Sequence, residues 1–161
     1  GGGGATGFPN LNDDDWLWGG SLEQIQQTIQ YGIRSGDAEA RTGSMPAFGR
    51  DGILQKAEIS AVADYVRTLS GIAQPGADFA KGKEVFAANC AACHGEDGKG
   101  NQELGAPNLT DGIWLYGSDK ATIEYGIVNG RGNVMPAWHA RLEPTTIKAL
   151  TVYVHSLGGG R

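Results

Sequence analysis

The residues with the clearest chemistry form one short stretch, Cys90-Ala91-Ala92-Cys93-His94. It contains both cysteines of the chain and one of its three histidines. Two thiols about one helical turn apart can each add to a vinyl group of haem, and the adjacent histidine can then bind the iron. Cys-x-x-Cys-His is the attachment motif of c-type haem. The spacing therefore predicts that Cys90 and Cys93 hold a haem covalently and that His94 is its proximal ligand.

Three other interpretations of the two cysteines are weaker. A thioredoxin-like redox pair needs a strand before the motif, whereas a helix-like segment precedes it here and a Gly-rich loop follows. A zinc site would need further ligands at suitable spacing, and the sequence has no third cysteine. A disulfide across two intervening residues would be strained.

The two methionines of the chain are candidates for the sixth ligand of a haem iron. They occur in Met45-Pro46-Ala47-Phe48 and Met135-Pro136-Ala137-Trp138, each between helical segments. A lone methionine is usually core filler, but two in the same context suggest a role. Proline stiffens such a loop, because it fixes φ and lacks a backbone donor. Met135 follows His94 in the chain, so we expect Met135 to be the distal ligand of this haem.

Composition limits the function classes. The net charge of −5 argues against nucleic-acid binding and permits a positively charged docking partner. No run of about twenty apolar residues is present, so we expect no membrane span within this chain. The sequence begins with glycine and shows no signal peptide, so we expect it to be an excised part of a longer protein. Its 27 glycines leave little apolar surface, and a haem would supply much of the missing core.

An internal repeat organises the chain. The matching pairs, in chain order, are Pro9-Asn10-Leu11 with Pro107-Asn108-Leu109, Trp16-Leu17-Trp18-Gly19 with Trp114-Leu115-Tyr116-Gly117, Tyr31-Gly32-Ile33 with Tyr125-Gly126-Ile127, the two Met-Pro-Ala segments, and Tyr65–Leu69 with Tyr153–Leu157. Two copies of one domain are therefore predicted, the first over residues 1–72 and the second over 78–161. Residues 73–77, with Pro75 and Gly76, form the linker.

The patterns predict helices and no strands. Ser21-Leu22-Glu23-Gln24 reads as a capping box before a helix with Leu22, Ile25, Ile29 and Ile33 on one face. Further helices are expected around Ile59–Leu69, ended by Gly71, from Asp78 into the cysteine motif, from Ser118, and from Pro144 to Leu157, followed by Gly158. The fold class is all-α.

These features together resemble a known family. Short helices, Cys-x-x-Cys-His after the first and a Met-Pro-Ala loop before the last are similar to a class I cytochrome c domain. The tandem pattern, with Pro107–Gly117 and Tyr125–Trp138, resembles the dihaem cytochrome c subunit (subunit III, CcoP or FixP) of cbb3-type cytochrome c oxidases. The resemblance covers nearly the whole chain.

The resemblance implies two tandem class I cytochrome c domains with all-α folds, the last helix of each crossing its first. It implies an electron-transfer subunit that is not itself an enzyme and that relays single electrons in aerobic respiration. The expected partners are the catalytic and monohaem subunits of the oxidase, with a cytochrome c or quinol-linked electron donor. The expected location is the bacterial periplasmic face of the inner membrane, reached through an N-terminal anchor outside this chain.

The first copy departs from this family pattern. It contains no cysteine and no histidine, although each family domain has its own Cys-x-x-Cys-His. Alignment of the copies puts the missing motif just before Gly1, so we expect it immediately upstream in the full-length protein. We therefore expect one haem c on this sequence and two on the full-length protein, with Met45 as an axial ligand of the first haem.

Four further residues are candidate haem contacts. Pro107 and Leu109 are expected to line the pocket. Trp114 could pack on the haem or bond a propionate through its indole N–H, although an ordinary core tryptophan is the alternative. Arg131, near Met135, could also bond a propionate or simply be solvated. His139 and His155 are expected not to be ligands.

Other haem functions stay open at this point. The chain could be a free dihaem shuttle or the cytochrome module of a periplasmic dehydrogenase, with the same haem chemistry and a different partner. A haem with an open distal side could instead serve as a peroxidase or gas sensor.

Overall fold

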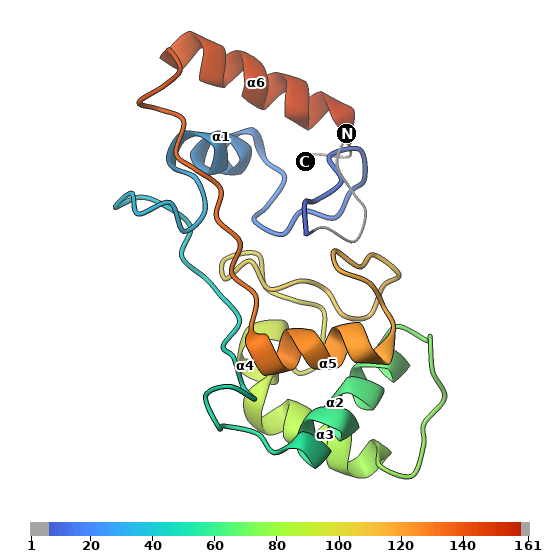
Figure 1. Cartoon of the computed structure of the whole chain (residues 1–161). Coiled ribbons are helices and arrows are strands. Elements are labelled where there is room, and N and C mark those ends of the chain that lie inside the picture. The colour runs from blue at the N-terminus through green and yellow to red at the C-terminus, as the bar shows by residue number, and fades with distance from the viewer. Residues whose placement is uncertain (1–6, 159–161) are drawn as a thin grey trace. The chain divides into compact units, whose positions relative to one another are not determined.

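The computed structural model describes residues 7–158 and is helical, with no strand among these residues (Figure 1). This confirms the expected all-α class. The helices, in chain order, are α1 (Leu22–Tyr31), α2 (Lys56–Leu69), α3 (Phe79–Asn89), α4 (Ala91–His94), α5 (Lys120–Asn129) and α6 (Pro144–Leu157).

Most helix ends follow the sequence signals. Ser21 and Gln24 form the predicted capping box at the start of α1, since the Ser21 hydroxyl accepts from the Gln24 backbone N–H and the Gln24 side chain accepts from the Ser21 N–H. Pro144 opens α6 and Gly158 follows it. The prediction for α5 was wrong by one residue, because Asp119, not Ser118, accepts the bond from Thr122 that caps the helix.

The two copies correspond in a register that differs from the one read from the sequence. α1 and α5 are each ten residues long, and each ends before a glycine at positive φ, Gly32 and Gly130. Tyr31-Gly32 therefore corresponds to Asn129-Gly130. The match of Tyr31 with Tyr125 was wrong by about one helical turn, a shift that keeps the same face of a helix inward.

The described residues form two compact units that do not follow the repeat. Unit 1 combines the chain through Gly43 with Gln102–Gly105 and the chain from Gly132 onward. Unit 2 combines Ser44–Asn101 with Ala106–Arg131. The boundaries predicted from the repeat, 1–72 and 78–161, describe the sequence copies, and each unit takes segments from both copies.

Unit 2 is built on α2. This helix packs against α3 and α5, and α3 also contacts the short α4 (Figure 1). Its core includes the buried residues Phe48, Leu54, Ile59, Val62, Ala63, Tyr65, Val66, Val85, Phe86 and Ile127. Gly82 lets α3 approach α2 closely, since a Cβ there would lie 2.3 Å from the Ala61 carbonyl oxygen.

Unit 1 pairs α1 with α6 (Figure 1). Ile25 and Ile29 of α1 and Ile147 of α6 form its buried core. The class I pattern predicted that α6 would cross α3, the first helix of its own copy. That prediction was wrong for the described residues: α6 packs on α1, and α3 packs on α2.

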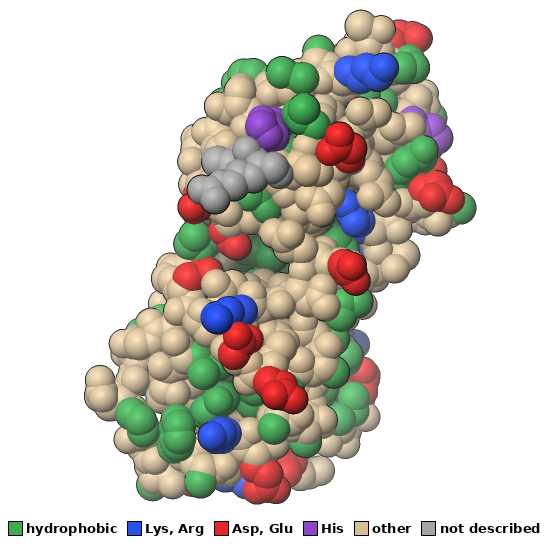
Figure 2. Space-filling view, turned by 180° about the vertical axis from the view of Figure 1, so that it is seen from behind, with side chains coloured by type: hydrophobic (Ala, Val, Ile, Leu, Met, Phe, Trp, Pro, Cys, Tyr) green, Lys and Arg blue, Asp and Glu red, His purple; other side chains and the backbone are tan. Residues whose placement is uncertain are grey.

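The surface carries charges of both signs. Figure 2 shows acidic side chains spread over the visible face with basic ones among them, rather than one single-sign patch. Among the helices that the structure describes, none has the length and apolar character needed to span a bilayer.

Candidate functional site

The cysteine motif lies at the junction of two helices. α3 ends at Asn89, Cys90 joins it to α4, and α4 ends at His94. The backbone N–H groups of Cys93 and His94 both donate to the Cys90 carbonyl oxygen, at 3.1 and 2.9 Å, so the motif forms one tight helical turn. Cys90 packs against the unit 2 core, while Cys93 is exposed, and both are free thiols. The predicted helix into the motif is confirmed.

His94 is held by a main-chain carbonyl. Its Nδ1 lies 3.0 Å from the Pro107 oxygen. A carbonyl oxygen can only accept, so Nδ1 carries the proton and the neutral ring keeps its lone pair on Nε2. Burial also lowers the pKa of His94, although the Pro107 bond opposes this shift. The imidazole is therefore neutral near pH 7 and has one nitrogen prepared to bind a metal.

A glycine loop places the Pro107 carbonyl. The Gly100 N–H donates to the His94 oxygen at 2.7 Å, and the Leu109 N–H donates to the Gly98 oxygen at 2.7 Å. Gly100 has φ +85°, and a Cβ there would lie 2.5 Å from the Ala106 carbonyl oxygen. Sequence reasoning missed this role of Gly100, although the glycines after the motif were a visible signal.

The thiol of Cys90 is kept protonated. Burial, and to a lesser degree the neighbouring Cys93, raises the pKa of the Cys90 thiol to about 11. A buried sulfur in this position favours an uncharged form. A thioether is uncharged at every pH, so it suits this environment better than a thiolate would.

The two methionines belong to different units. Met45 is half-buried and packs against the unit 2 core, the same core that Cys90 and Leu109 contact. Met135 belongs to unit 1 and packs against the core of Ile25, Ile29 and Ile147. The sequence analysis expected His94 and Met135 to be the two axial ligands of one haem, but the two residues belong to different units.

The remaining candidates are all in unit 2. Trp114 packs against its core, and the buried indole Nε1 has no hydrogen-bond partner among the described residues. The Arg131 guanidinium lies 3.8 Å from the centre of the Tyr116 ring and 5.4 Å from that of Tyr125. Arg131 is thus stacked on aromatic rings, a contact that the sequence did not predict.

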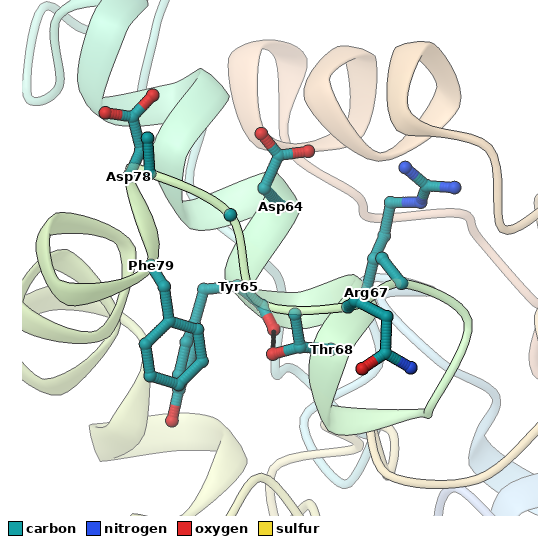
Figure 3. A pocket seen from close by; sticks show the side chains of 10 residues that line it. Asp64, Tyr65, Arg67, Thr68, Asp78 and Phe79 are labelled. Atoms are coloured by element: carbon teal, nitrogen blue, oxygen red, sulfur yellow. Dashed lines mark hydrogen bonds between the residues drawn. The ribbon is translucent and has the colours of Figure 1, made fainter.

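A separate hollow of about 280 Å³ lies where α2 meets the start of α3 (Figure 3). Asp64, Tyr65, Arg67 and Thr68 line it from α2, with Asp78 and Phe79 opposite. The Tyr65 and Phe79 rings pack at 5.4 Å between centroids, and the Thr68 hydroxyl donates to the Tyr65 carbonyl oxygen. The described residues contain no cluster of three or more His, Cys, Asp or Glu side chains that could bind a metal ion. The cysteine motif is therefore the candidate site.

Comparison with known proteins agrees with this choice. Residues 77–154 match the family model described as cytochrome c oxidase, cbb3-type, subunit III. These residues belong to the cbb3-type subunit III family. The resemblance drawn from the sequence motifs is confirmed.

Relatives named as cbb3-type cytochrome c oxidase subunits match all or nearly all of the chain. It is 74% identical to the cbb3-type cytochrome c oxidase subunit FixP of Azorhizobium caulinodans, over 100% of this chain and 55% of that protein. It is 65% identical to FixP of Bradyrhizobium diazoefficiens, over 100% and 56%. It is 54% identical to subunit CcoP of Cereibacter sphaeroides, over 98% and 54%. The chain spans about half the length of these relatives.

The site suits the haem c that a subunit III cytochrome implies. Two sulfurs on one helical turn can reach adjacent haem vinyl groups, and the neutral His94 ring can supply Nε2. The unpartnered indole N–H of Trp114 is a buried donor without an acceptor, and a haem propionate is an acceptor that could satisfy it.

Proposed function

We propose that this chain is an electron-transfer segment of a cbb3-type cytochrome c oxidase and carries haem c on Cys90 and Cys93. The observation that carries the proposal is the single helical turn Cys90–His94 with His94 Nδ1 fixed by Pro107 at 3.0 Å. When bound, the haem supplies a one-electron change between ferric and ferrous iron.

The protein residues have separate tasks at this site. Cys90 and Cys93 tether the haem edge, and His94 presents Nε2 to the proximal side. Pro107 accepts the Nδ1 proton, which fixes the ring orientation and raises the donor strength of Nε2. A methionine thioether on the distal side would raise the reduction potential and fill the last iron position. A filled distal side favours electron relay over peroxide or gas chemistry.

The wider role follows from the relatives. We propose that the full-length protein carries a second haem c, bound through a Cys-x-x-Cys-His outside this chain. It would act on the periplasmic face of the bacterial inner membrane with the catalytic and monohaem subunits. Electrons would come from a cytochrome c or a quinol-linked donor and pass toward the catalytic subunit, so this subunit would do no bond-making chemistry itself.

The proposal is tested on the chain produced together with a haem-attachment system. Pyridine haemochrome analysis with intact mass should give one covalent haem, and a potentiometric titration should show a reversible one-electron step. Replacement of both Cys90 and Cys93 by alanine should abolish covalent haem. Tight carbon monoxide binding by the reduced wild-type chain would contradict a pure electron carrier, because it requires an open distal side.

A second measurement addresses the oxidase. In the full-length protein within its complex, His94→Gly should slow electron flow to oxygen while the complex still assembles. Unchanged oxygen consumption with an assembled complex would contradict the relay role of this site.

A further inference from the structure

We infer that Trp18 of the first copy is a positioning residue for His94, the proximal ligand in the second copy. It acts through the chain between Asn101 and Pro107, which we call the proximal loop. The inference deepens the proposed function and rests on it, because it concerns a ligand of the same haem. A residue of the first copy thus sets the strength of a bond at the proximal ligand of the second.

The proximal loop is closed at its base by two backbone bonds. The Asn101 N–H donates to the Ala106 oxygen at 2.9 Å, and the Ala106 N–H donates to the Asn101 oxygen at 3.0 Å. Ala106 is followed directly by Pro107, whose carbonyl oxygen accepts from Nδ1 of His94 at 3.0 Å. A displacement of the loop therefore reaches the Pro107 carbonyl through a single intervening residue.

The tip and the base of the proximal loop belong to different units. Gln102–Gly105 group with unit 1, whereas Asn101 and the chain from Ala106 group with unit 2, which contains His94. Residues 102–104 are exposed and Gly105 is half-buried, so the tip packs with its backbone at Gly105. Unit 1 thus holds the tip of a loop whose base carries the hydrogen-bond partner of the histidine.

Trp18 provides the surface against which the tip packs within unit 1. A Cβ on Gly105 would lie 2.5 Å from Cη2 of Trp18 and closer still to two other atoms of the indole. Gly105 also has φ +62°, a conformation that glycine adopts without strain. A Cβ on Gly43 would overlap the Leu104 oxygen and lie 3.2 Å from Cη2 of Trp18. Two glycines therefore bring the tip and the ring into direct contact.

Trp18 is itself fixed in unit 1. It is buried, and Nη2 of Arg41 donates to its carbonyl oxygen at 3.3 Å. The guanidinium carbon of Arg41 lies 5.7 Å from the centre of the Trp18 ring. The Arg41 backbone N–H donates to the Gly32 oxygen at 3.1 Å, which ties this pair to the end of α1. A ring held in this way can set the position of the tip.

An ordinary core role for Trp18 is the alternative. A core tryptophan would stabilise unit 1 alone, and its replacement would leave His94 unchanged as long as the chain stays folded. A positioning residue changes the hydrogen bond at Nδ1 of His94, on which the donor strength of Nε2 depends. The two roles therefore predict different behaviour of the proximal ligand.

The test uses the haem-loaded chain and follows the Nδ1 proton of His94 by NMR. Trp18→Leu should speed exchange of this proton for deuterium by about tenfold, the factor that corresponds to loss of a typical hydrogen bond. The reduction potential should rise, since a weaker bond at Nδ1 lowers the donor strength of Nε2 and stabilises ferric iron less. Wild-type exchange and potential in a folded Trp18→Leu chain would overturn the inference.

Ile25→Ala is the control for a general loss of stability in unit 1. Ile25 is buried in the core that α1 forms with α6, so this variant should be less stable but keep the wild-type exchange rate at His94. Trp18→Phe replaces Trp18→Leu if the latter does not fold, and should exchange faster than the wild type. Equal exchange rates in folded Ile25→Ala and either Trp18 variant would speak against a positioning role.

A double-mutant cycle with Gly105→Ala tests the route. Its methyl group meets the indole in the wild type but a smaller side chain in the Trp18→Leu background. If Trp18 acts through the tip, Gly105→Ala should speed the exchange less in that background than in the wild type. The same factor in both backgrounds would show that the two residues act independently, which contradicts the inference.

The outcomes also separate this inference from the proposed function. A chain in which the Trp18 variants change the His94 proton as expected, but which fails to exchange electrons with a c-type cytochrome, would contradict the relay role alone. A chain that relays electrons while its Trp18 variants keep the wild-type exchange and potential would overturn the inference alone.

Discussion

At the scale of single residues, the proximal side of the site depends on a contact between two loops. Pro107 accepts from His94 only because the backbone at Gly100 runs close beside Ala106 and Pro107. Gly100 therefore supports the proximal ligand indirectly, through the position of the Pro107 carbonyl.

Gly100→Ala should disturb the histidine without touching it. The new methyl group would lie 2.5 Å from the Ala106 carbonyl oxygen, and φ at +85° is strained for alanine. We expect a cost of about 1–3 kcal/mol and a weaker His94–Pro107 bond. Electron paramagnetic resonance of the ferric chain should show altered axial ligand parameters. Gly112→Ala is the control, since no atom lies within 4 Å of its Cβ position. Equal effects of the two variants would contradict this role of Gly100.

The pair Asp37–His139 in unit 1 predicts a pH dependence. The Glu39 backbone N–H and the His139 ring, at 2.7 Å, hold the pKa of Asp37 below its usual value. A carboxyl with a lowered pKa stabilises the folded state above the unfolded pKa, and this contribution is lost as pH falls through the folded pKa.

In the Asp37→Asn variant, the free energy of unfolding should therefore fall less steeply as the pH is lowered. Urea midpoints measured from pH 6 down to pH 3 should fall less steeply in the variant than in the wild type. Asp51→Asn, at an exposed carboxyl of unit 2, is the control. Parallel curves for the wild type and Asp37→Asn would refute the contribution.

At the scale of elements, α3 and α2 form the closest helix contact of unit 2. Gly82→Ala would raise helix propensity by about 1 kcal/mol, but its methyl group would lie 2.3 Å from the Ala61 oxygen and 2.7 Å from the Tyr65 Cβ. Backbone cannot yield as a side chain can, so we expect a net loss of about 1–3 kcal/mol. Thermal unfolding followed at the haem Soret band measures it. Gly76→Ala, with no atom within 4 Å, should leave the midpoint nearly unchanged.

The capping residues give a second prediction at this scale. Ser21→Ala removes the acceptor for the Gln24 N–H at the start of α1 and should cost about 1 kcal/mol of unit 1 stability. Ser118→Ala should cost much less, because Asp119 and not Ser118 caps α5. Chemical denaturation of the two variants side by side measures the difference. A larger loss for Ser118→Ala would support the cap predicted from the sequence.

Local features were predictable because the chemistry behind them is local. The capping box at Ser21, Pro144 at the start of α6 and the turn at Cys90 each depend on residues a few positions apart. The register of the repeat could not be predicted from identical residues in the two copies. Tyr31 and Tyr125 look equivalent, but a shift of one turn preserves the buried isoleucine face, so only the helix ends reveal it.

At the scale of the whole molecule, the sequence could not say which copy supplies each helix. Both copies carry the same kinds of helix with the same apolar faces, so pairing within a copy and across copies bury similar surfaces. The chain passes from one unit to the other near Gly43 and Gly132, among other places. No periodicity or motif in those short segments records that choice.

The composition of unit 2 predicts which fragment of the chain keeps a working haem site. Residues 44–131 contain all of unit 2, whereas residues 78–161 lack Met45 and α2. When each is produced with a haem-attachment system, the first should give a folded protein with the methionine-to-iron band. The second should lack that band. A normal band from residues 78–161 alone would show that the second copy is self-sufficient.

The pairing of helices from the two copies also affects when the chain can fold during synthesis. α1 leaves the ribosome well before its partner α6, the last helix that the structure describes in this chain (Figure 1). α2 likewise emerges before α3 and α5, and its apolar face is uncovered until they follow. The contact between α1 and α6 is distant in sequence, and contacts of this kind slow folding and prolong exposure to proteases and aggregation. The apolar face of α1 therefore lacks its partner until α6 has been made.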